Sequence, residues 1–557
     1  MKAVPTWFGA PGRPLFGWFH APDGGTAMGA AVFCGPLGVE GPNSLWAVQD
    51  ASDKLAAQGV AALRFAYSGT GDSAERLDDP GRLAAWLSDI DEAVQLARRA
   101  TSGPVVLIGL RIGALFALEA AARGTAVDGL ALWDPYKAGR SFFRFEKTLL
   151  ATWYGASQLG DGSVSGAGFT YSPETVQTVS PLTLTPLHTG TVPTAVLVRS
   201  NQFGMDDARA RFEASGADWI EVEGHDQLFD VPPDMITLPT TSIKTLVDWT
   251  TSVVDGPRHP VRFEPVDTAV VGEVDGRPIT EHPVWLGPNS LFGMVTEPAL
   301  AVPDDAPTLV FLSSGALDHV GPGRRWVQLT RHFATVGIRS VRIDFDGLGE
   351  SYGRPGQARN IPTPPEAIDD MVDLAAALGD PDAGRLVFIG LSSGAYHAIE
   401  AGLRLHPLAV CAVNPGLTGW VPEIDHGPLD PRRRAFRPMA PAFRSIAVKH
   451  HRMTHAAWRT LLMVLVRRSP ADSLCGVSRR GTPVLLIVTE SDAHQFEPSP
   501  YWSMVRRRLT GRGLLEVRIV PGSDHSTYTV DGQKSTFPIL VDWVVNRFGR
   551  SGADHPS

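Results

Sequence analysis

A serine stands between two glycines at residues 390–394 (GLSSG), where the apolar run RLVFI gives way to a helical stretch. G-x-S-x-G between a strand and a helix is typical of a nucleophile elbow, a strained turn that exposes the serine hydroxyl. Gly390 and Gly394 suit this turn because neighbouring backbone passes close to both positions. The helix start also favours negative charge beside the reacting carbon. The pattern therefore predicts Ser392 as a nucleophile.

Two further groups follow in the order expected for a catalytic triad on such an elbow, acid before histidine. Asp492 comes shortly after the apolar run PVLLIV, and His525 comes shortly after the run LLEVRIV. In this arrangement His525 is the general base and Asp492 orients it. Glu490, in the same loop as Asp492, is the alternative acid.

Short apolar runs alternate with helical stretches around these residues. Near-continuous apolar runs are typical of parallel strands buried on both faces, and strand–helix alternation predicts a mainly parallel sheet flanked by helices. The helix expected between them covers Pro365–Leu378. The expected strands are Thr308–Leu312, Ser340–Ile343, Arg385–Ile389 and Pro483–Val488.

The chain repeats itself with a period of about 280 residues. Ordered matches with slowly rising offsets indicate two homologous α/β domains, each with its own core. We expect them at 1–256 and 257–557, with a join near Asp255–Pro260. The matched segments include Gly69–Ser73 with Gly347–Ser351, Gly109–Ala114 with Gly390–Ala395, and Leu246–Trp249 with Leu540–Trp543.

With its serine elbow, late acid and final histidine, the second copy resembles α/β-hydrolases of the serine-aminopeptidase-like and exosortase-associated types. Asp346–Ser351 is similar to that family's turn after an early strand. The resemblance implies tandem α/β-hydrolase domains with lid insertions. It also implies an oxyanion hole made by the backbone N–H of Ser393 and a second donor in the loop Ser314-Gly315-Ala316. The more usual His-Gly of that loop is absent.

In the first copy, Arg111 occupies the elbow position in the segment VVLIGLRIGALFALEAA. A guanidinium stays protonated and is not a plausible nucleophile, so this copy is predicted to be a degenerate, non-catalytic domain. Gln202 stands opposite Asp492, and His225 is the counterpart of His525. Two roles are open for Arg111. With His225, it binds an anionic group of a ligand at the helix start, or it forms an ion pair with an acidic side chain beneath a closed pocket.

A long insertion at about 416–480 is expected to form a lid over the second copy. From Pro431 to Pro470 it holds nine Arg and one Lys, with no Asp or Glu, interleaved with apolar residues. The apolar residues of such a lid could cover an acyl chain in the pocket, and its basic residues could meet an anionic partner on the outside. Candidate partners are an acyl-carrier protein, a coenzyme A thioester and anionic lipid. The alternative is a solvated basic helix.

The composition limits the remaining possibilities. The chain has 557 residues, 43% hydrophobic and 20% charged, and its net charge of −9 argues against general nucleic-acid binding. Three scattered cysteines suggest neither a disulfide framework nor a cysteine-rich metal site, and no metal or organic cofactor is expected. The start lacks a signal peptide, and Arg111 interrupts the most membrane-like stretch, Pro104–Ala122. These features favour a cytoplasmic protein that does not span a membrane.

The sequence thus predicts a serine hydrolase that cleaves an ester or thioester through an acyl-enzyme. An acyltransferase would use the same triad with an alcohol or amine in place of water, and the resemblance leaves a peptidase open. The alternative from another class is a non-catalytic binding or scaffold protein, since the first copy has already lost its triad.

Overall fold

The computed structural model describes residues 3–155, 158–186, 192–200, 202, 204–300, 302–303, 305–415, 470–490, 492–493 and 500–549. Most of the expected lid, 416–469, and with it the basic segment, therefore lies outside the described residues. Among the described residues, no helix combines the length and the apolar composition that crossing a membrane requires.

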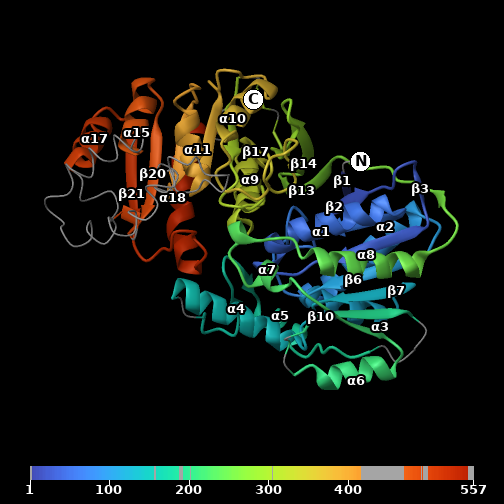
Figure 1. Cartoon of the computed structure of the whole chain (residues 1–557). Helices are drawn as coiled ribbons and strands as arrows, with labels where there is room; N and C mark the ends of the chain where they lie inside the picture. The colour runs from blue at the N-terminus through green and yellow to red at the C-terminus, as the bar shows by residue number, and fades with distance from the viewer. Residues whose placement is uncertain are drawn as a thin grey trace, which may run out of the picture.

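The chain forms two mainly parallel sheets flanked by helices, which confirms the predicted fold class (Figure 1). The first sheet has eight strands, and the pairs at its β1 edge are antiparallel. In spatial order they are β1 (Val4–Phe8), β2 (Leu15–His20), β5 (Val60–Phe65), β4 (Gly29–Cys34), β6 (Val105–Leu110), β7 (Gly129–Trp133), β10 (Thr194–Arg199) and β11 (Asp218–Val222).

The second sheet repeats this order and adds one strand at its antiparallel edge. In spatial order its strands are β13 (Ala269–Val274), β14 (Arg277–Leu286), β15 (Leu291–Glu297), β17 (Arg339–Ile343), β16 (Thr308–Phe311), β18 (Leu386–Leu391), β19 (Ala409–Val413), β20 (Val484–Thr489) and β21 (Leu515–Val520). The four predicted strands are found here as β16, β17, β18 and β20, within two residues at each end.

Helices cover both faces of each sheet and bury its apolar side chains. In the first half they are α1 (Glu40–Ala57), α2 (Arg82–Ala100), α3 (Ile112–Ala122), α4 (Gly139–Tyr154), α5 (Pro173–Val179), α6 (Asp206–Ala214), α7 (Asp226–Phe229) and α8 (Thr240–Val254). In the second half they are α9 (Arg325–Thr335), α10 (Ala367–Ala377), α11 (Ser393–Ala401), α15 (Pro470–Arg479), α17 (Pro500–Thr510) and α18 (Val530–Phe548). The short elements are β3 (Thr26–Ala27), β8 (Val164–Ser165), β9 (Thr170–Tyr171), β12 (His259–Pro260), and the 3₁₀ turns η1 (Pro233–Met235) and η2 (Pro322–Arg324).

The connection between the halves runs back along the first half before the second sheet begins. Strand β12 pairs with β3, and Phe263 stacks on Phe19 with ring centroids 4.0 Å apart. The backbone N–H of Trp7 then donates to the carbonyl of Val266. The chain therefore leaves the first half only near Ala269, where β13 starts.

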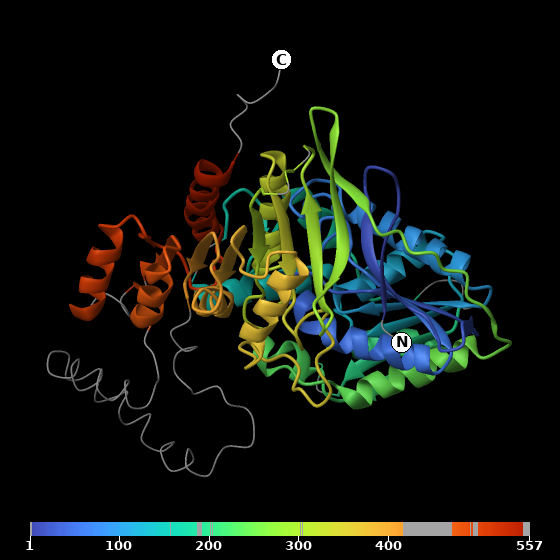
Figure 2. The same cartoon turned by 90° about the horizontal axis from the view of Figure 1, so that it is seen from above.

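The two halves meet through matching elements (Figure 2). Arg64 on β5 pairs with Glu350 of the second half at 2.6 Å, and Arg342 on β17 pairs with Asp72 of the first half at 3.2 Å. Each arginine and each acid occupies the same place in its own half, so the contact is nearly two-fold symmetric, as in an isologous dimer.

Aromatic rings fill the space beside these ion pairs. Trp18 packs against Trp285 and Phe292, with ring centroids 6.1 and 4.8 Å apart. The buried cluster also includes Trp7 and Phe16. Apolar burial and reciprocal ion pairs together hold the halves in one arrangement.

Candidate active site

The predicted elbow is present between β18 and α11. Ser392 has φ 53° and ψ −115°, a conformation that L-residues rarely adopt, and its own N–H donates to the carbonyl of Val413. A Cβ at Gly390 would lie 2.2 Å from the carbonyl carbon of Gly394, and one at Gly394 would lie 2.6 Å from the carbonyl oxygen of Ser313. Both positions therefore require glycine, and the turn presents the serine at the carboxyl edge of the sheet.

The structure brings the three predicted triad residues into one hydrogen-bonded chain. The Nε2 atom of His525 lies 2.9 Å from the hydroxyl oxygen of Ser392, and its Nδ1 lies 2.6 Å from Oδ2 of Asp492. The carboxylate fixes the tautomer, because Nδ1 donates to Asp492 and Nε2 is left to accept the serine proton. Asp492 follows β20 and His525 follows β21, so two adjacent strand ends deliver them.

Asn414, which belongs to none of the predicted motifs, connects the loops of Asp492 and His525. This buried residue directly follows β19 and has a φ of 44°. Its side-chain amide donates to the carbonyl of His525 at 2.7 Å and accepts from the backbone N–H of Thr489 at 2.7 Å. The Thr489 hydroxyl in turn donates to Asp492 at 3.2 Å. Asn414 is thus a positioning residue for both partners of Ser392; an asparagine after a strand is too common a pattern to reveal this.

The predicted oxyanion-hole residues lie beside the elbow. Ser393 is the first residue of α11, where backbone N–H groups have no partner within the helix. The loop 314–316 approaches from the end of β16, and the Gly315 N–H donates to the Ser393 hydroxyl at 2.8 Å. The Gly315 N–H is therefore bonded to the Ser393 side chain in this arrangement and is not free to donate to an oxyanion at Ser392.

A pocket of about 460 Å³ opens at Ser392, and both halves build it. The second half supplies the elbow, the loop 314–317 and Tyr528. The first half supplies Trp153 and Tyr154 at the end of α4 and the segment Pro232–Asp234. Tyr154 packs edge-on against Tyr528, and Figure 1 shows α4 beneath the second half beside α18. Trp153 keeps 54% of its surface exposed, so an apolar surface lies at the mouth.

The comparison with protein families agrees with this geometry. Residues 309–532 match the alpha/beta hydrolase family. The matched residues include the elbow and the loops of Asp492 and His525 in the α/β-hydrolase half. No curated protein matches the sequence.

Two solved structures that are similar to part of this chain have low sequence identity and low TM-scores. Est1E from Butyrivibrio proteoclasticus is 16% identical, with a TM-score of 0.33, over 46% of this chain and 100% of that one. A carboxylesterase of the thaumarchaeon Nitrososphaera gargenis is 16% identical, with a TM-score of 0.29, over 47% of this chain and 98% of that one.

The first half repeats the elbow of the α/β-hydrolase half with an arginine at its apex. Arg111 has φ 57° and ψ −119°, and its N–H donates to the carbonyl of Trp133, as that of Ser392 does to Val413. Its buried guanidinium donates to Glu40 at 2.7 Å and to Asp134 at 3.0 Å. It also lies over the ring of Tyr136 at 4.1 Å. Of the two predicted roles, this geometry matches the buried ion pair, because two carboxylates occupy the place of an anionic ligand.

His225 is not placed to bind a ligand together with Arg111, because it is enclosed in the core. It is fully buried, and its Nε2 accepts from the indole N–H of Trp133 at 2.6 Å. Burial lowers the pKa of His225 to about 4. The neutral ring is therefore a core residue of the first half, and the predicted anion-binding role does not fit it. The counterpart of Asp492, Gln202, donates instead to the carbonyl of Pro135.

Replacing Arg111 with methionine is expected to lower the free energy of unfolding by about 3–5 kcal/mol, because Glu40 would remain buried without its cation and Asp134 would keep only Arg199. Urea unfolding of the purified variant measures this. The exposed Arg123, paired with Glu119, provides a control, and Arg123→Met should cost no more than about 1 kcal/mol. A variant that keeps full stability but loses affinity for a small anion would restore the ligand-binding role.

Glu146 on α4 gives a pH-dependent test of the first half. Both carboxylate oxygens are buried without a hydrogen-bond partner among the described residues. Burial, together with the nearby Glu40, raises the pKa of Glu146 to about 8 from its ordinary 4.5. Between these values the folded state keeps the proton and the unfolded state loses it. Stability contributed by this group is therefore lost as the pH rises through that window.

Glu146→Gln should remove this loss. Relative to the parent protein, the variant should gain about 1.4 kcal/mol of unfolding free energy for each pH unit from about 4.5 to 8. Urea unfolding across this range measures the difference. The exposed Glu213→Gln is the control and should show no such slope. A flat difference for Glu146→Gln would mean that the buried carboxyl is not held neutral.

Proposed function

We propose that the α/β-hydrolase half is a serine hydrolase that cleaves an ester or thioester through an acyl-enzyme. The observation that carries this proposal is the hydrogen-bonded chain from the Ser392 hydroxyl through His525 to Asp492, on a strained elbow at the edge of a pocket. A purely structural serine would have no need of a histidine base 2.9 Å from its hydroxyl, oriented in turn by a carboxylate.

The chemistry follows from the positions of these atoms. The Ser392 oxygen attacks the substrate carbonyl while Nε2 of His525 takes its proton. Asp492 stabilises the resulting imidazolium, and the N–H of Ser393 at the start of α11 donates to the oxyanion. The imidazolium then protonates the leaving alcohol or thiol. A water, deprotonated by the same Nε2, attacks the acyl-enzyme and frees the acid and Ser392.

Trp153 of the first half is expected to shape substrate binding in the other half. Its exposed indole lies at the pocket mouth, where an apolar acyl group would cover it. Trp153→Ala should raise KM for long-chain esters about 10-fold with little change in kcat, because roughly 1–2 kcal/mol of apolar burial is lost. Steady-state kinetics with short and long p-nitrophenyl esters measure this. Equal effects on kcat and on both chain lengths would contradict it.

Product analysis distinguishes hydrolysis from acyl transfer. Short- and long-chain p-nitrophenyl esters, coenzyme A thioesters and acyl-carrier-protein thioesters are incubated with and without an added alcohol or amine. We expect free acid as the main product in both cases. An acyl-transfer product that displaces free acid would make the protein an acyltransferase on the same triad. Turnover of none of these substrates, with full biological activity of Ser392→Ala, would favour a non-catalytic scaffold.

A further inference from the structure

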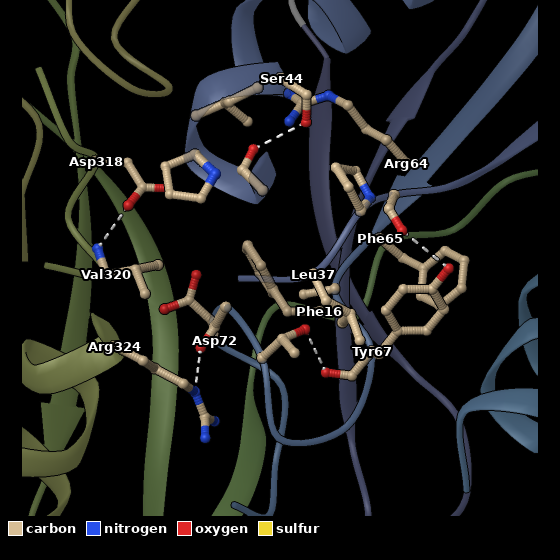
Figure 3. A pocket seen from close by; sticks show the side chains of 18 of the residues that line it. Phe16, Leu37, Ser44, Arg64, Phe65, Tyr67, Asp72, Asp318, Val320 and Arg324 are labelled. Carbon is tan, nitrogen blue, oxygen red and sulfur yellow. Dashed lines mark hydrogen bonds between the residues drawn. The ribbon is translucent and has the colours of Figure 1, made fainter. Parts of the chain in front are cut away.

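A second cavity, of about 200 Å³, lies between the halves on the side of the first half (Figure 3). The first half supplies a largely apolar wall that includes Phe16, Leu37, Phe65 and Tyr67. The second half closes it with the loop Asp318–Gly321 together with Arg324 and Glu350. The cavity is thus the reciprocal of the Ser392 pocket, since each pocket belongs to one half and is completed by the other.

Most charged side chains that line this cavity already have ion-pair or hydrogen-bond partners within the protein. Arg64 and Glu350 pair with each other through two hydrogen bonds of 2.6 and 2.7 Å. Asp72 accepts from His319 at 2.9 Å and pairs with Arg342. The guanidinium of Arg324 donates to three backbone carbonyls of the first half.

Asp318 is the exception. Its carboxylate accepts the backbone N–H of Val320 at 3.3 Å, and within the described residues it forms no ion pair with a side-chain nitrogen of Lys, Arg or His. The charge of the neighbouring His319 acts on it without such a contact. The side chain keeps some accessible surface although burial raises its pKa above the ordinary value. In Figure 3 it borders the same open space as Phe16 and Leu37. A carboxylate that makes no direct ion pair at the wall of an apolar cavity gains from a ligand that carries its own positive charge.

We propose that this cavity binds a small apolar amine, with the ammonium group on Asp318 and the hydrocarbon part against Phe16, Phe65 and Leu37. The volume suits a ligand close in size to a substituted benzene, since cavities of about 150 Å³ hold benzene itself. The aromatic wall adds cation–π attraction to apolar burial. No bond is made or broken, so the first half acts here as a binding domain.

One loop connects this cavity to the Ser392 pocket. Residues 314–317 line the serine pocket, and the next residues, 318–321, line the cavity. A ligand that moves or fixes Asp318 therefore acts directly on the loop whose Gly315 contacts Ser393. A ligand in the cavity should therefore change the rate of hydrolysis at Ser392. Such an effect would be an energetic coupling between the two sites. This consequence rests on the proposed function, whereas ligand binding does not.

Calorimetric titration of the full chain with 2-phenylethylamine and with its neutral isostere 2-phenylethanol tests the site. At about pH 8.5 the amine is still mostly protonated. The amine should bind at least about 10-fold more tightly than the alcohol, and Asp318→Asn should remove this preference. Asp234→Asn, which changes a carboxylate at the Ser392 pocket, should leave the preference intact.

The preference of the unaltered protein can be measured even where a variant fails to fold. Equal affinity for amine and alcohol, or no binding of either, would overturn the proposal. So would a preference that survives in a folded Asp318→Asn variant. If the amine binds as expected but leaves ester hydrolysis unchanged, the coupling is wrong and the site stands. If no ester or thioester is cleaved while the amine still binds, the proposed function fails and the site again stands.

Discussion

Replacing Ser392 with alanine is expected to lower kcat for ester or thioester hydrolysis by about 10,000-fold or more while the protein keeps its fold. The loss is large because the variant can form no acyl-enzyme, and His525 has no hydroxyl to deprotonate. The Ser392 side chain contacts the triad and the pocket rather than the apolar core, so the unfolding free energy should change by less than about 1 kcal/mol. Initial rates with the best ester, measured beside urea unfolding, provide both quantities.

Ser393→Ala is the matched control for this variant. It removes the neighbouring hydroxyl, which accepts from Gly315, but keeps the backbone N–H at the start of α11. We expect it to retain activity within about 10-fold, because the loss concerns one hydrogen bond of the loop. Loss of activity in Ser393→Ala with survival in Ser392→Ala would place the nucleophile one residue later and refute the geometry described above.

Arg342→Met should lower the unfolding free energy by about 3–5 kcal/mol, the second large effect. Arg342 is fully buried between the halves, where it pairs with Asp72 at 3.2 Å and Glu281 at 2.9 Å. His319 bridges Asp72 and Asp344 in the same network at 2.9 Å each. Although burial lowers it, the pKa of His319 is raised well above its ordinary value by these two carboxylates. Methionine would leave the acids with one cation fewer in a buried site.

Urea unfolding followed by fluorescence and circular dichroism measures this loss. Arg404→Met provides the comparison, because Arg404 pairs with Asp369 at the surface and both side chains are more than half exposed. This control should cost less than about 1 kcal/mol. A similar small cost for Arg342→Met would mean that the interface does not depend on its ion pairs.

Much of the fold follows from local patterns in the sequence. The apolar runs that become β16, β18 and β20 are buried on both faces, so their hydrophobicity alone identifies them. The repeat along the chain anticipates two sheets with the same strand order. The elbow can also be predicted from the sequence, because its geometry excludes any side chain at Gly390 and Gly394 and so requires glycine at both positions.

The contacts between the halves could not be predicted in the same way. Asp72 and Glu350 are recognisable as equivalent positions of a repeated turn, but nothing in that turn shows that each acid pairs with an arginine of the opposite half. Their partners are set by how two sheets pack, not by spacing along the chain. The same holds for Glu40 and Asp134, which surround Arg111 from a distant helix and strand end.

Asn414 and Asp318 were missed for a related reason. Neither belongs to a spaced motif, and each acquires a role only where separate loops converge. Sequence patterns identify residues that a local conformation requires, whereas positioning and pocket-lining residues depend on tertiary neighbours.

The central claim is that His525 activates the Ser392 hydroxyl, and covalent labelling with a fluorophosphonate tests it most directly. The reagent needs an activated serine, so peptide mapping of the full chain by mass spectrometry should locate one adduct, on Ser392. Labelling should slow at least about 100-fold in His525→Ala, because the base is lost. An adduct on another serine, or equally fast labelling of Ser392 without His525, would contradict the account.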